Sequence, residues 1–502
     1  MATLKFNKAS FQHSVELGEV RLDLPPSKSL LIRQIFLETA QWIRSVGPLE
    51  SEPKDREDLA EDIRSALALT TAIRRHVLAA KHPSLYKVEQ PNLVEQPNHF
   101  DPPNQVEQPD QGAEVRWEAG EAGTVMRFGL ALLAFAGLGG VLQGQGRAHQ
   151  RPIKGLVDAL RALGAGIHYL EREGYPPLRL EPSQLHGGRV VLPSNVSSQF
   201  ASALLLGSVC REVDLELHWG PEELLSRPYL DMTLAMIQAS GWSTNAGPYH
   251  ASLGSYRVTE NQALEPEGDW SAATFWILRQ AAYPLATTLI LSNLNPRSLQ
   301  GDAVLLGWLS WLAPHLEWVM TPIGSGERGD LTLRVKDGVE VSSPSWENPV
   351  ANHPAEWEQQ GDRWICHAEG IPDMVPALAV WAVLRGLRLE IRGVGHLAYK
   401  ESNRLQALCD NLQGVGIQCR VIHGEEIVLL VDPDRPWAQQ LEGDRRPERG
   451  SFRSFGDHRM VMAMSMLAMP GWDIALDDAR VVSKSYPTFW EHWRALGYDL
   501  KG

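Results

Sequence analysis

Long helical segments in this 502-residue chain are apolar on nearly every face. A surface helix carries a polar face, whereas a helix that is apolar all round must be covered by other elements. Shorter segments typical of β-strands separate the helices, at 188–193, 286–294, 387–394 and 425–432. We therefore expect an α/β protein whose helices lie inside and whose sheets surround them. The apolar helical segments span 123–137, 195–209, 269–282, 372–386, 400–416 and 457–469.

The same segments begin in polar residues that suit anions. A helix N-terminus presents free backbone N–H groups and a partial positive charge, so it favours phosphate and carboxylate. Hydroxyl groups, amides and cations accumulate at these starts along the whole chain. We infer that several segments converge on one strongly anionic ligand set. The residues concerned are Ser27–Ser29 with Arg33, Gly123–Thr124 with Arg127, Ser197–Gln199, Lys400–Arg404, Asp457–Arg459 and Lys484–Ser485.

Each motif taken alone has a simpler explanation. Lys28 could be a solvated surface lysine, and Ser198 could merely cap a helix. Lys400 and Glu401 could form an exposed pair of charges, and Asp457–Arg459 an ordinary surface turn. The combination is harder to dismiss, because arginine pairs well with carboxylate and phosphate, at about 1.5–3 kcal/mol for each charge-assisted hydrogen bond.

The overall charge favours a small anionic ligand over a nucleic acid. The formal net charge is −14 at pH 7, whereas nucleic-acid-binding proteins usually have a basic balance or a basic face. No segment reaches the roughly 18 apolar residues of a membrane span, and the N-terminal residues lack the apolar core of a signal peptide. We therefore expect a cytoplasmic protein without a membrane partner. The four cysteines lack metal-binding spacing, so we expect reduced, buried or incidental thiols at Cys210, Cys366, Cys409 and Cys419.

Residues 86–112 interrupt the pattern of helices and strands. Val-Glu-Gln-Pro occurs three times there, in a stretch rich in proline and poor in apolar residues. Such a composition does not form a packed core. We expect a flexible surface insertion, and a docking segment for a partner protein is the alternative.

Two carboxylates, Asp373 and Glu401, also lie at helix starts among the cations. A carboxylate in a cationic site stays ionised and can act as a base, while a neighbouring lysine can act as an acid. The chain lacks the phosphate-binding loop GxxxxGK[ST], a GxGxxG dinucleotide motif and a GxSxG nucleophile elbow. ATP-driven transfer, dinucleotide redox chemistry and serine hydrolysis therefore lose support.

Taken in order, these motifs resemble those of the EPSP synthase family, the 3-phosphoshikimate 1-carboxyvinyltransferases. PPSKSLLIR at 25–33 is similar to the family's PxSKSxxxR, and EAGTVMR at 121–127 is similar to its NAGTxxR. Residues 151–180 are similar to the segment that holds a family arginine for phosphoenolpyruvate (PEP). The resemblance covers nearly the whole chain and continues through 195–200, 226–234, 267–275, 371–374, 400–404, 456–460 and 483–490.

The resemblance implies a two-domain inside-out α/β barrel (EPT/RTPC-like), each domain having three βαβαββ units with helices inside and sheets outside. Residues 26–265, with the 86–112 insertion, would form the N-terminal enolpyruvyl transferase domain. Residues 1–25 and 266–502 would form the C-terminal one, with the active site in the cleft between them. The family moves the enolpyruvyl group of PEP to the 5-hydroxyl of shikimate 3-phosphate. The resemblance implies no metal, no cofactor and a monomer.

The resemblance also implies roles for individual residues. Asp373 would accept the proton of the 5-hydroxyl, and Lys28 and Glu401 would move protons at the PEP methylene. Asp457 and His458 would support the neighbouring arginine. Shikimate 3-phosphate would be bound by Lys28, Ser29, Arg33, Ser197, Ser198, Gln199, Ser226, Tyr229, Asp373 and Lys400. PEP would be bound by Lys28, Gly123, Arg127, Arg151, Gln199, Arg404, Arg459 and Lys484.

The chain departs from the family pattern close to these residues. Glu121 replaces Asn, where its carboxylate could repel PEP or pair with an arginine, and Phe128 replaces proline, so its helix could be set differently. His396 replaces Asn, and Asn403 replaces Asp. Glu121, His396 and Asn403 favour a non-catalytic descendant that binds phosphorylated ligands, an alternative that the retained cations and carboxylates oppose. Enolpyruvyl transfer to a UDP-sugar is a second alternative, which the SKS start opposes.

Overall fold

The apolar helices expected from the sequence are buried in the computed structural model. Every residue of α8 (Trp270–Ala282) is buried, and so is all of α10 (Val375–Arg385) except its last residue. In α4 (Gly123–Ala136) only Thr124 and Ala136 are not buried. The structure describes residues 1–6, 19–45, 59–81, 114–193, 198–211, 213–220, 226–257, 266–324, 327–337, 354–424, 426–441 and 450–501.

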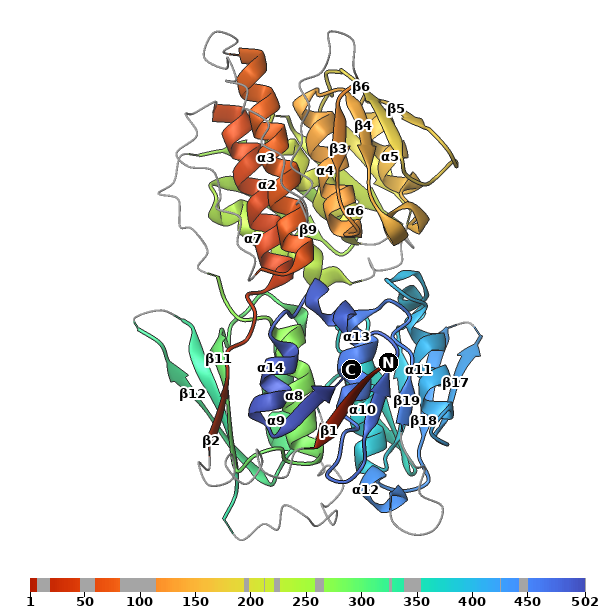
Figure 1. The fold of residues 1–502 in the computed structure, drawn as a ribbon. Coiled ribbons are helices and arrows are strands. Elements are labelled where there is room, and N and C mark those ends of the chain that lie inside the picture. Colours follow the sequence, from red (N-terminus) through yellow and green to blue (C-terminus); the bar gives the residue numbers. More distant parts are fainter. Residues whose placement is uncertain are drawn as a thin grey trace, which may run out of the picture.

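The lower lobe in Figure 1 contains three sheets around central helices. Its strands are β1 (Ala2–Phe6), β2 (Glu19–Leu22), β11 (Thr288–Leu294), β12 (Leu316–Pro322), β13 (Gly329–Val335), β14 (Trp357–Gln360), β15 (Arg363–His367), β16 (Arg388–Arg392), β17 (Gln418–His423), β18 (Ile427–Asp432), β19 (Gly450–Phe452), β20 (Ile474–Leu476) and β21 (Tyr498–Lys501). The sheet orders are β19–β20–β1–β21, β12–β13–β11–β2 and β14–β15–β16–β18–β17. The N-terminal strands therefore complete sheets whose other strands come from the second half of the chain.

The helices of this lobe lie between its sheets and carry several of the polar starts. Besides α8 and α10 they are α9 (Leu305–Leu312), α11 (Arg404–Gln413), α12 (Trp437–Gln440), α13 (His458–Ser465) and α14 (Phe489–Ala495). Short 3-10 helices are η2 (Gly301–Val304), η3 (Gly395–Tyr399) and η4 (Arg480–Lys484). In chain order, β15, α10, β16, α11, β17 and β18 make one βαβαββ unit of the expected kind.

The upper lobe contains two sheets among the described residues, with orders β3–β4–β6–β5 and β7–β8–β10–β9. Its elements are α2 (Lys28–Ser45), α3 (Glu61–Lys81), β3 (Arg116–Glu118), β4 (Gly140–Gln143), η1 (Gly146–Gln150), α5 (Lys154–Ala162), β5 (Gly166–Tyr169), β6 (Leu178–Glu181), β7 (Gly188–Leu192), α6 (Ser198–Ser208), β8 (Leu215–Trp219), α7 (Arg227–Ala239), β9 (Trp242–Gly247) and β10 (His250–Tyr256). Two complete βαβαββ units follow from this order, one from β3 to β6 and one from β7 to β10. Of a third unit only the helices α2 and α3 fall within the described part of the chain.

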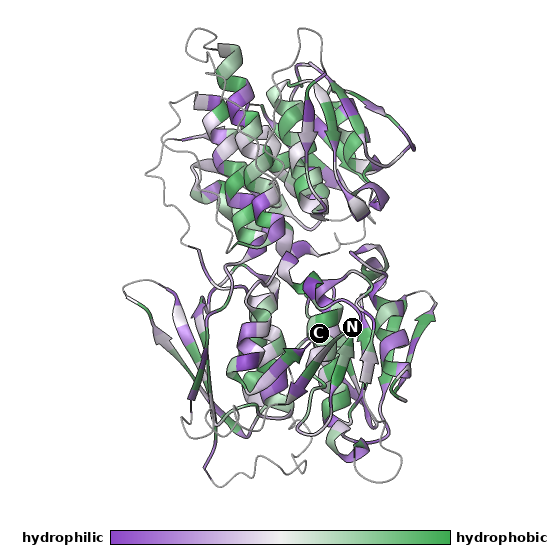
Figure 2. Cartoon of the chain, in the orientation of Figure 1, coloured by the Kyte–Doolittle hydropathy of each residue, from purple (hydrophilic) through white to green (hydrophobic). Residues whose placement is uncertain are grey.

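The chain crosses between the lobes twice, and the two crossings run side by side. The Ser27 N–H donates to the Glu267 carbonyl (2.8 Å), and the Asp269 N–H donates to the Pro25 carbonyl (2.9 Å). The buried apolar side chains form two separate clusters, one in each lobe. Each lobe therefore has its own core, and hydrophilic residues are frequent where the lobes meet (Figure 2).

The described residues test some of the remaining expectations about the chain and leave others untested. All four cysteines are free and buried, as expected. Among the described helices none combines the length and apolarity needed to cross a membrane. The 86–112 insertion and Ser197 lie outside the described residues.

Candidate active site

A cavity of about 550 Å³ lies where the two lobes meet. Its walls carry the polar helix starts of both lobes, so residues far apart in the sequence face one another across it. From the upper lobe it is lined by Lys28, Ser29, Arg33, Gly123, Arg127, Arg151, Ser198, Gln199, Ser226 and Tyr229. From the lower lobe it is lined by Asp373, Lys400, Glu401, Arg404 and Arg459.

Lys484 is the exception among the described residues predicted for the site, because it does not line this cavity. Its ammonium group instead lies 2.5 Å from the carboxylate of Glu121, across the junction of the lobes. The sequence predicts that Lys484 contacts PEP, and the side chain is occupied by a partner that the family pattern lacks.

Asp373 is the centre of a charged network in the cavity wall. Its carboxylate accepts hydrogen bonds from Arg404 Nη1 (2.8 Å) and from the Tyr229 hydroxyl (2.7 Å). Arg459 Nη2 lies 3.1 Å away. Burial raises the pKa of Asp373, but the charges of Arg459, Lys400 and Arg404 outweigh it and hold the pKa well below its usual range. Asp373 is therefore ionised at neutral pH.

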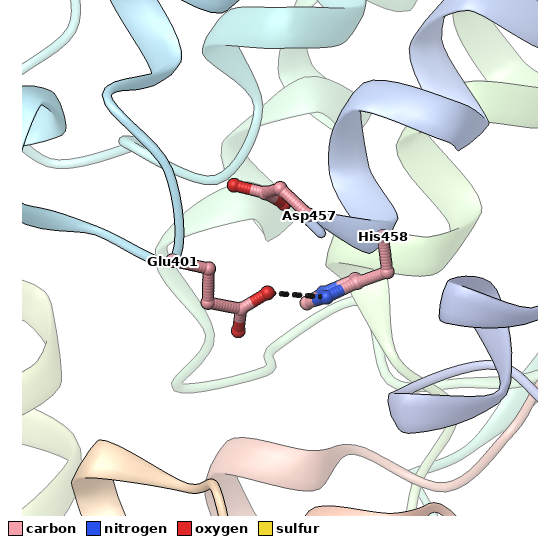
Figure 3. A group of neighbouring side chains, drawn as sticks. All are labelled: Glu401, Asp457 and His458. Atoms are coloured by element: carbon pink, nitrogen blue, oxygen red, sulfur yellow. Dashed lines mark ion pairs between the residues drawn. The ribbon is translucent and has the colours of Figure 1, made fainter. Parts of the chain in front are cut away.

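A second carboxylate network consists of Glu401, Asp457 and His458 (Figure 3), and Glu401 and His458 line the cavity. The Glu401 carboxylate lies 2.7 Å from Nδ1 of His458, and the His458 ring is almost fully buried. Burial raises the pKa of Glu401, but His458 and Lys28 outweigh it and hold the pKa well below its ordinary value. Asp457 caps α13 and accepts from Arg404 Nε (2.8 Å) and the Ser402 hydroxyl (3.0 Å).

This second network could in principle offer ligands to a metal ion. The ligand atoms of Glu401, Asp457 and His458 lie within 4.8 Å of one another. The Asp457 carboxylate, however, already pairs with Arg404. A protein guanidinium thus stands where a metal would supply the positive charge, which favours a structural ion-pair network.

Lys28 has a partner that sequence reasoning missed. Its ammonium lies 2.8 Å from Asp62, which also lines the cavity and sits in the first turn of α3. Burial lowers the pKa of Lys28, but the charges of Asp62 and Glu401 outweigh it and raise the pKa. The signal for Asp62 was present in the sequence, since Glu61-Asp62 is one more polar start of a helix, here an amphipathic one.

Burial weakens the charged form of two upper-lobe arginines, Arg127 and Arg33. Burial and the neighbouring Arg151 lower the pKa of Arg127 to about 9. Burial lowers the pKa of Arg33 to about 10, and its guanidinium stacks over Tyr229. Arg127 Nη1 donates to the Gln199 amide oxygen. An anion beside Arg127 and Arg151 would relieve their mutual repulsion, so this wall is suited to phosphate or carboxylate.

Lys400 extends the cationic wall into the lower lobe. Burial lowers the pKa of Lys400 to about 8; Asp373 opposes this shift, while Arg404, Arg459 and Arg151 reinforce it. The group therefore changes its charge close to physiological pH.

The comparisons with known proteins agree with this arrangement. A family model described as EPSP synthase (3-phosphoshikimate 1-carboxyvinyltransferase) matches residues 92–493. The chain belongs to the EPSP synthase family.

Curated relatives named 3-phosphoshikimate 1-carboxyvinyltransferase support the family assignment. One from Bacteroides fragilis is 30% identical over 383 residues, which cover 76% of this chain and 83% of the relative. One from Syntrophobacter fumaroxidans is 32% identical over 390 residues, which cover 75% of this chain and 79% of the relative.

Solved structures confirm the predicted fold class. An EPSP synthase from Acinetobacter baumannii aligns with a TM-score of 0.63 at 19% identity, covering 100% of this chain and 99% of that one. The enolpyruvyl transferase NikO from Streptomyces tendae aligns with a TM-score of 0.54 at 15% identity, covering 100% and 98%. The chain therefore has the two-domain inside-out α/β fold of EPSP synthases.

The departures from the EPSP synthase pattern have distinct structural consequences. Phe128 is buried within α4, which still begins at Gly123 and spans nearly the expected range. Asn403 caps α11 by accepting from the Gln406 N–H (3.3 Å), so it retains the capping function of an Asp. His396 lines the cavity, and burial together with the charge of Lys400 lowers its pKa to about 3. The imidazole is therefore neutral at physiological pH.

Proposed function

We propose that this protein transfers the enolpyruvyl group of PEP to the 5-hydroxyl of shikimate 3-phosphate, giving 5-enolpyruvylshikimate 3-phosphate and phosphate in the shikimate pathway. The observation that carries the proposal is the cavity between the lobes. It collects Lys28, Asp373 and Glu401 together with cations from both lobes. Family membership supports the same reaction.

The reaction combines an addition with an elimination. The methylene carbon of PEP gains a proton, the 5-hydroxyl oxygen bonds to the central carbon, and the hydroxyl proton leaves. A proton then leaves the same methyl group and the C–O bond to phosphate breaks, which gives the enolpyruvyl ether. Two phosphates and two carboxylates must be held together, so the chemistry needs many fixed cations and little water.

We assign the proton transfers to the residues that face the cavity. Asp373 is ionised and can accept the hydroxyl proton as the C–O bond forms. Lys28 has a raised pKa and is therefore protonated at neutral pH, so its ammonium group carries the proton for the methylene carbon. Glu401 has a lowered pKa and is ionised, so it can take the proton back. His458 and Asp457 hold Glu401 and Arg404 in position.

The two anionic substrates divide the cavity between them. Shikimate 3-phosphate would lie against Lys28, Ser29, Arg33, Ser197, Ser198, Gln199, Ser226, Tyr229, Asp373 and Lys400. PEP would lie against Lys28, Gly123, Arg127, Arg151, Gln199, Arg404, Arg459 and Lys484. Both substrates need cations from both lobes, so binding should draw the lobes together.

The domain division is part of the same proposal. We place residues 26–265 in one domain and residues 1–25 with 266–502 in the other. The separate cores and the paired crossings support these boundaries. We also propose that the protein is cytoplasmic and a monomer. Size-exclusion chromatography with light scattering of the purified protein would test whether it is a monomer.

The decisive experiment measures inorganic phosphate released by the purified protein with PEP, shikimate 3-phosphate or both. We expect release only with both substrates, together with the enolpyruvyl product by mass spectrometry. Asp373→Asn should lower kcat by about 10²- to 10⁴-fold, the usual contribution of a general base. The matched control is Asp330→Asn, whose carboxylate pairs with Arg21 outside the cavity and should leave kcat unchanged.

Other outcomes would overturn the proposal. Tight binding of shikimate 3-phosphate without turnover would identify a non-catalytic descendant. Undiminished kcat in Asp373→Asn would remove Asp373 from the reaction. Turnover with a UDP-sugar in place of shikimate 3-phosphate would change the substrate class.

A further inference from the structure

Glu121 and Lys484 form an ion pair that joins the two lobes. Glu121 lies two residues before the start of α4 in the upper lobe, and Lys484 ends η4 in the lower lobe. The carboxylate oxygen and the ammonium nitrogen are 2.5 Å apart, and the two side chains are 37% and 26% exposed. The pair lies near the cavity, since Gly123, two residues beyond Glu121, lines it.

We propose that Glu121 is an internal competitor of PEP for Lys484 and thereby sets the affinity of the site for PEP. This inference rests on the proposed function. The carboxylate of Glu121 occupies the ammonium that an incoming phosphate or carboxylate of PEP would need. PEP must therefore displace a covalently attached anion before Lys484 can bind it.

The Glu121 side chain packs against Gly146. Gly146 has a φ of +53°, and a methyl group added there would lie 2.8 Å from Glu121 Oε1. The glycine thus leaves room for the carboxylate next to η1. The Lys484 ammonium lies 2.5 Å from this carboxylate, and Lys484 does not line the cavity that the other described cations predicted to bind PEP line.

Several carboxylates surround Lys484 and keep its ammonium group charged. Burial lowers the pKa of Lys484, but its hydrogen bond to Glu121 and the charges of Glu401 and Glu61 outweigh this and raise it. Burial raises the pKa of Glu61, as does the charge of Glu121, while Lys484 lowers it. Lys484 therefore remains a full cation whose charge is already shared among carboxylates.

Glu121→Gln tests the competition, because glutamine keeps the shape of the side chain and removes its charge. A partly exposed ion pair is worth a factor of about 1.4 to 5 in an equilibrium. We expect the KM for PEP to fall by about two- to fivefold, while kcat and the KM for shikimate 3-phosphate change by less than about twofold. The matched control is Glu114→Gln, which removes a carboxylate from another partly exposed pair, with Arg179 at 2.6 Å, and should change no constant.

A second measurement reads the pair itself without turnover. Lysines of the free protein are labelled with acetic anhydride and the rate at Lys484 is followed by mass spectrometry. We expect faster labelling of Lys484 in Glu121→Gln than in the parent protein or in Glu114→Gln. Equal labelling rates would show that Glu121 does not hold Lys484, and would overturn the inference.

The two measurements separate this inference from the proposed function. If the parent protein turns over and Glu121→Gln leaves the KM for PEP unchanged, the competition is absent although the function stands. If the parent protein does not turn over, calorimetric titration of the parent protein and of Glu121→Gln with PEP decides whether Glu121 competes with PEP. A gain in PEP affinity in Glu121→Gln supports the competition, and no gain overturns it.

Discussion

Asp457→Asn should destabilise the lower lobe, because it removes a buried charge on which Arg404 depends. The Asp457 side chain is 0% exposed and the Arg404 side chain 3%. The carboxylate accepts from Arg404 Nε at 2.8 Å, from Ser402 and from the Arg459 N–H. Asparagine keeps the helix cap but turns one of these oxygens into a donor that faces other donors.

The magnitude follows from burial. Removing one partner of a buried ion pair costs about 3–5 kcal/mol, since the other charge is left without compensation. Arg404 keeps its contact with Asp373 at 2.8 Å, so we place the loss at the lower end, about 3 kcal/mol. For a lobe of this size that corresponds to a fall in Tm of roughly 6–12 °C.

Urea unfolding, followed by far-UV circular dichroism and tryptophan fluorescence, measures this loss. The control is Asp231→Asn, which breaks the pair with Arg227 at 2.6 Å, where the aspartate side chain is 50% exposed. A helical surface pair of this kind is worth about 0.5 kcal/mol or less. A loss below about 1 kcal/mol in Asp457→Asn, or one equal to the control, would refute the argument that burial sets the cost.

The pH dependence gives the same prediction a second test. Burial raises the pKa of Asp457, but Arg404 and His458 outweigh it, and the net pKa is below the ordinary value. A carboxylate with a lowered pKa contributes stability above its unfolded pKa of about 3.9 and loses that contribution as the pH falls through the folded pKa. The difference between parent and variant should therefore be full at pH 7 and shrink below about pH 4. A difference that stays constant down to pH 3 would contradict the electrostatic origin.

Two further outcomes concern the cavity. Lys400, with a pKa of about 8, loses its charge at higher pH, so kcat/KM for shikimate 3-phosphate should fall by up to about tenfold per pH unit above pH 8. Lys400→Arg, whose guanidinium stays charged, should remove this fall. Parallel pH profiles of kcat/KM in the parent protein and the variant would contradict the assignment. In Gly123→Ala the new Cβ would lie 2.8 Å from Arg151 Cδ, so the KM for PEP should rise about tenfold or more, whereas Gly307→Ala, which meets no atom within 4 Å, should have no effect.

Much of the fold was predictable because burial leaves a strong pattern in the sequence. The segment 269–282 is mostly apolar, and α8 is buried throughout its length. The family motifs then predicted the domain architecture to which such helices belong. It was also predictable that the polar N-terminal segments of the helices would line one site. Lys28, Arg127 and Arg404 come from three such segments, and all three line the cavity.

The pairing of charges inside the site was not predictable in the same way. Asp62 lies 34 residues from Lys28, and Glu121 lies 363 residues from Lys484. Such partners depend on how two lobes meet and on which rotamers reach across, and neither leaves a periodic signal. The sequence suggested that Glu121 would repel PEP or pair with an arginine, and the partner is instead Lys484.

These pairings change how the site should bind anions. Asp373 is held by Arg404 and Arg459, and Glu121 by Lys484, so these three lower-lobe cations already have carboxylate partners. A substrate anion must exchange with these carboxylates or share their cations, which lowers its net binding energy. The same carboxylates fix the guanidinium groups in place before the substrate arrives, and a preorganised cation needs no rearrangement as charge develops in the reaction. The protein therefore exchanges substrate affinity for a rigid electrostatic frame. Glu121 pairs with Lys484, which does not line the cavity, so it is the position where that balance can be changed without disturbing the Asp373 network.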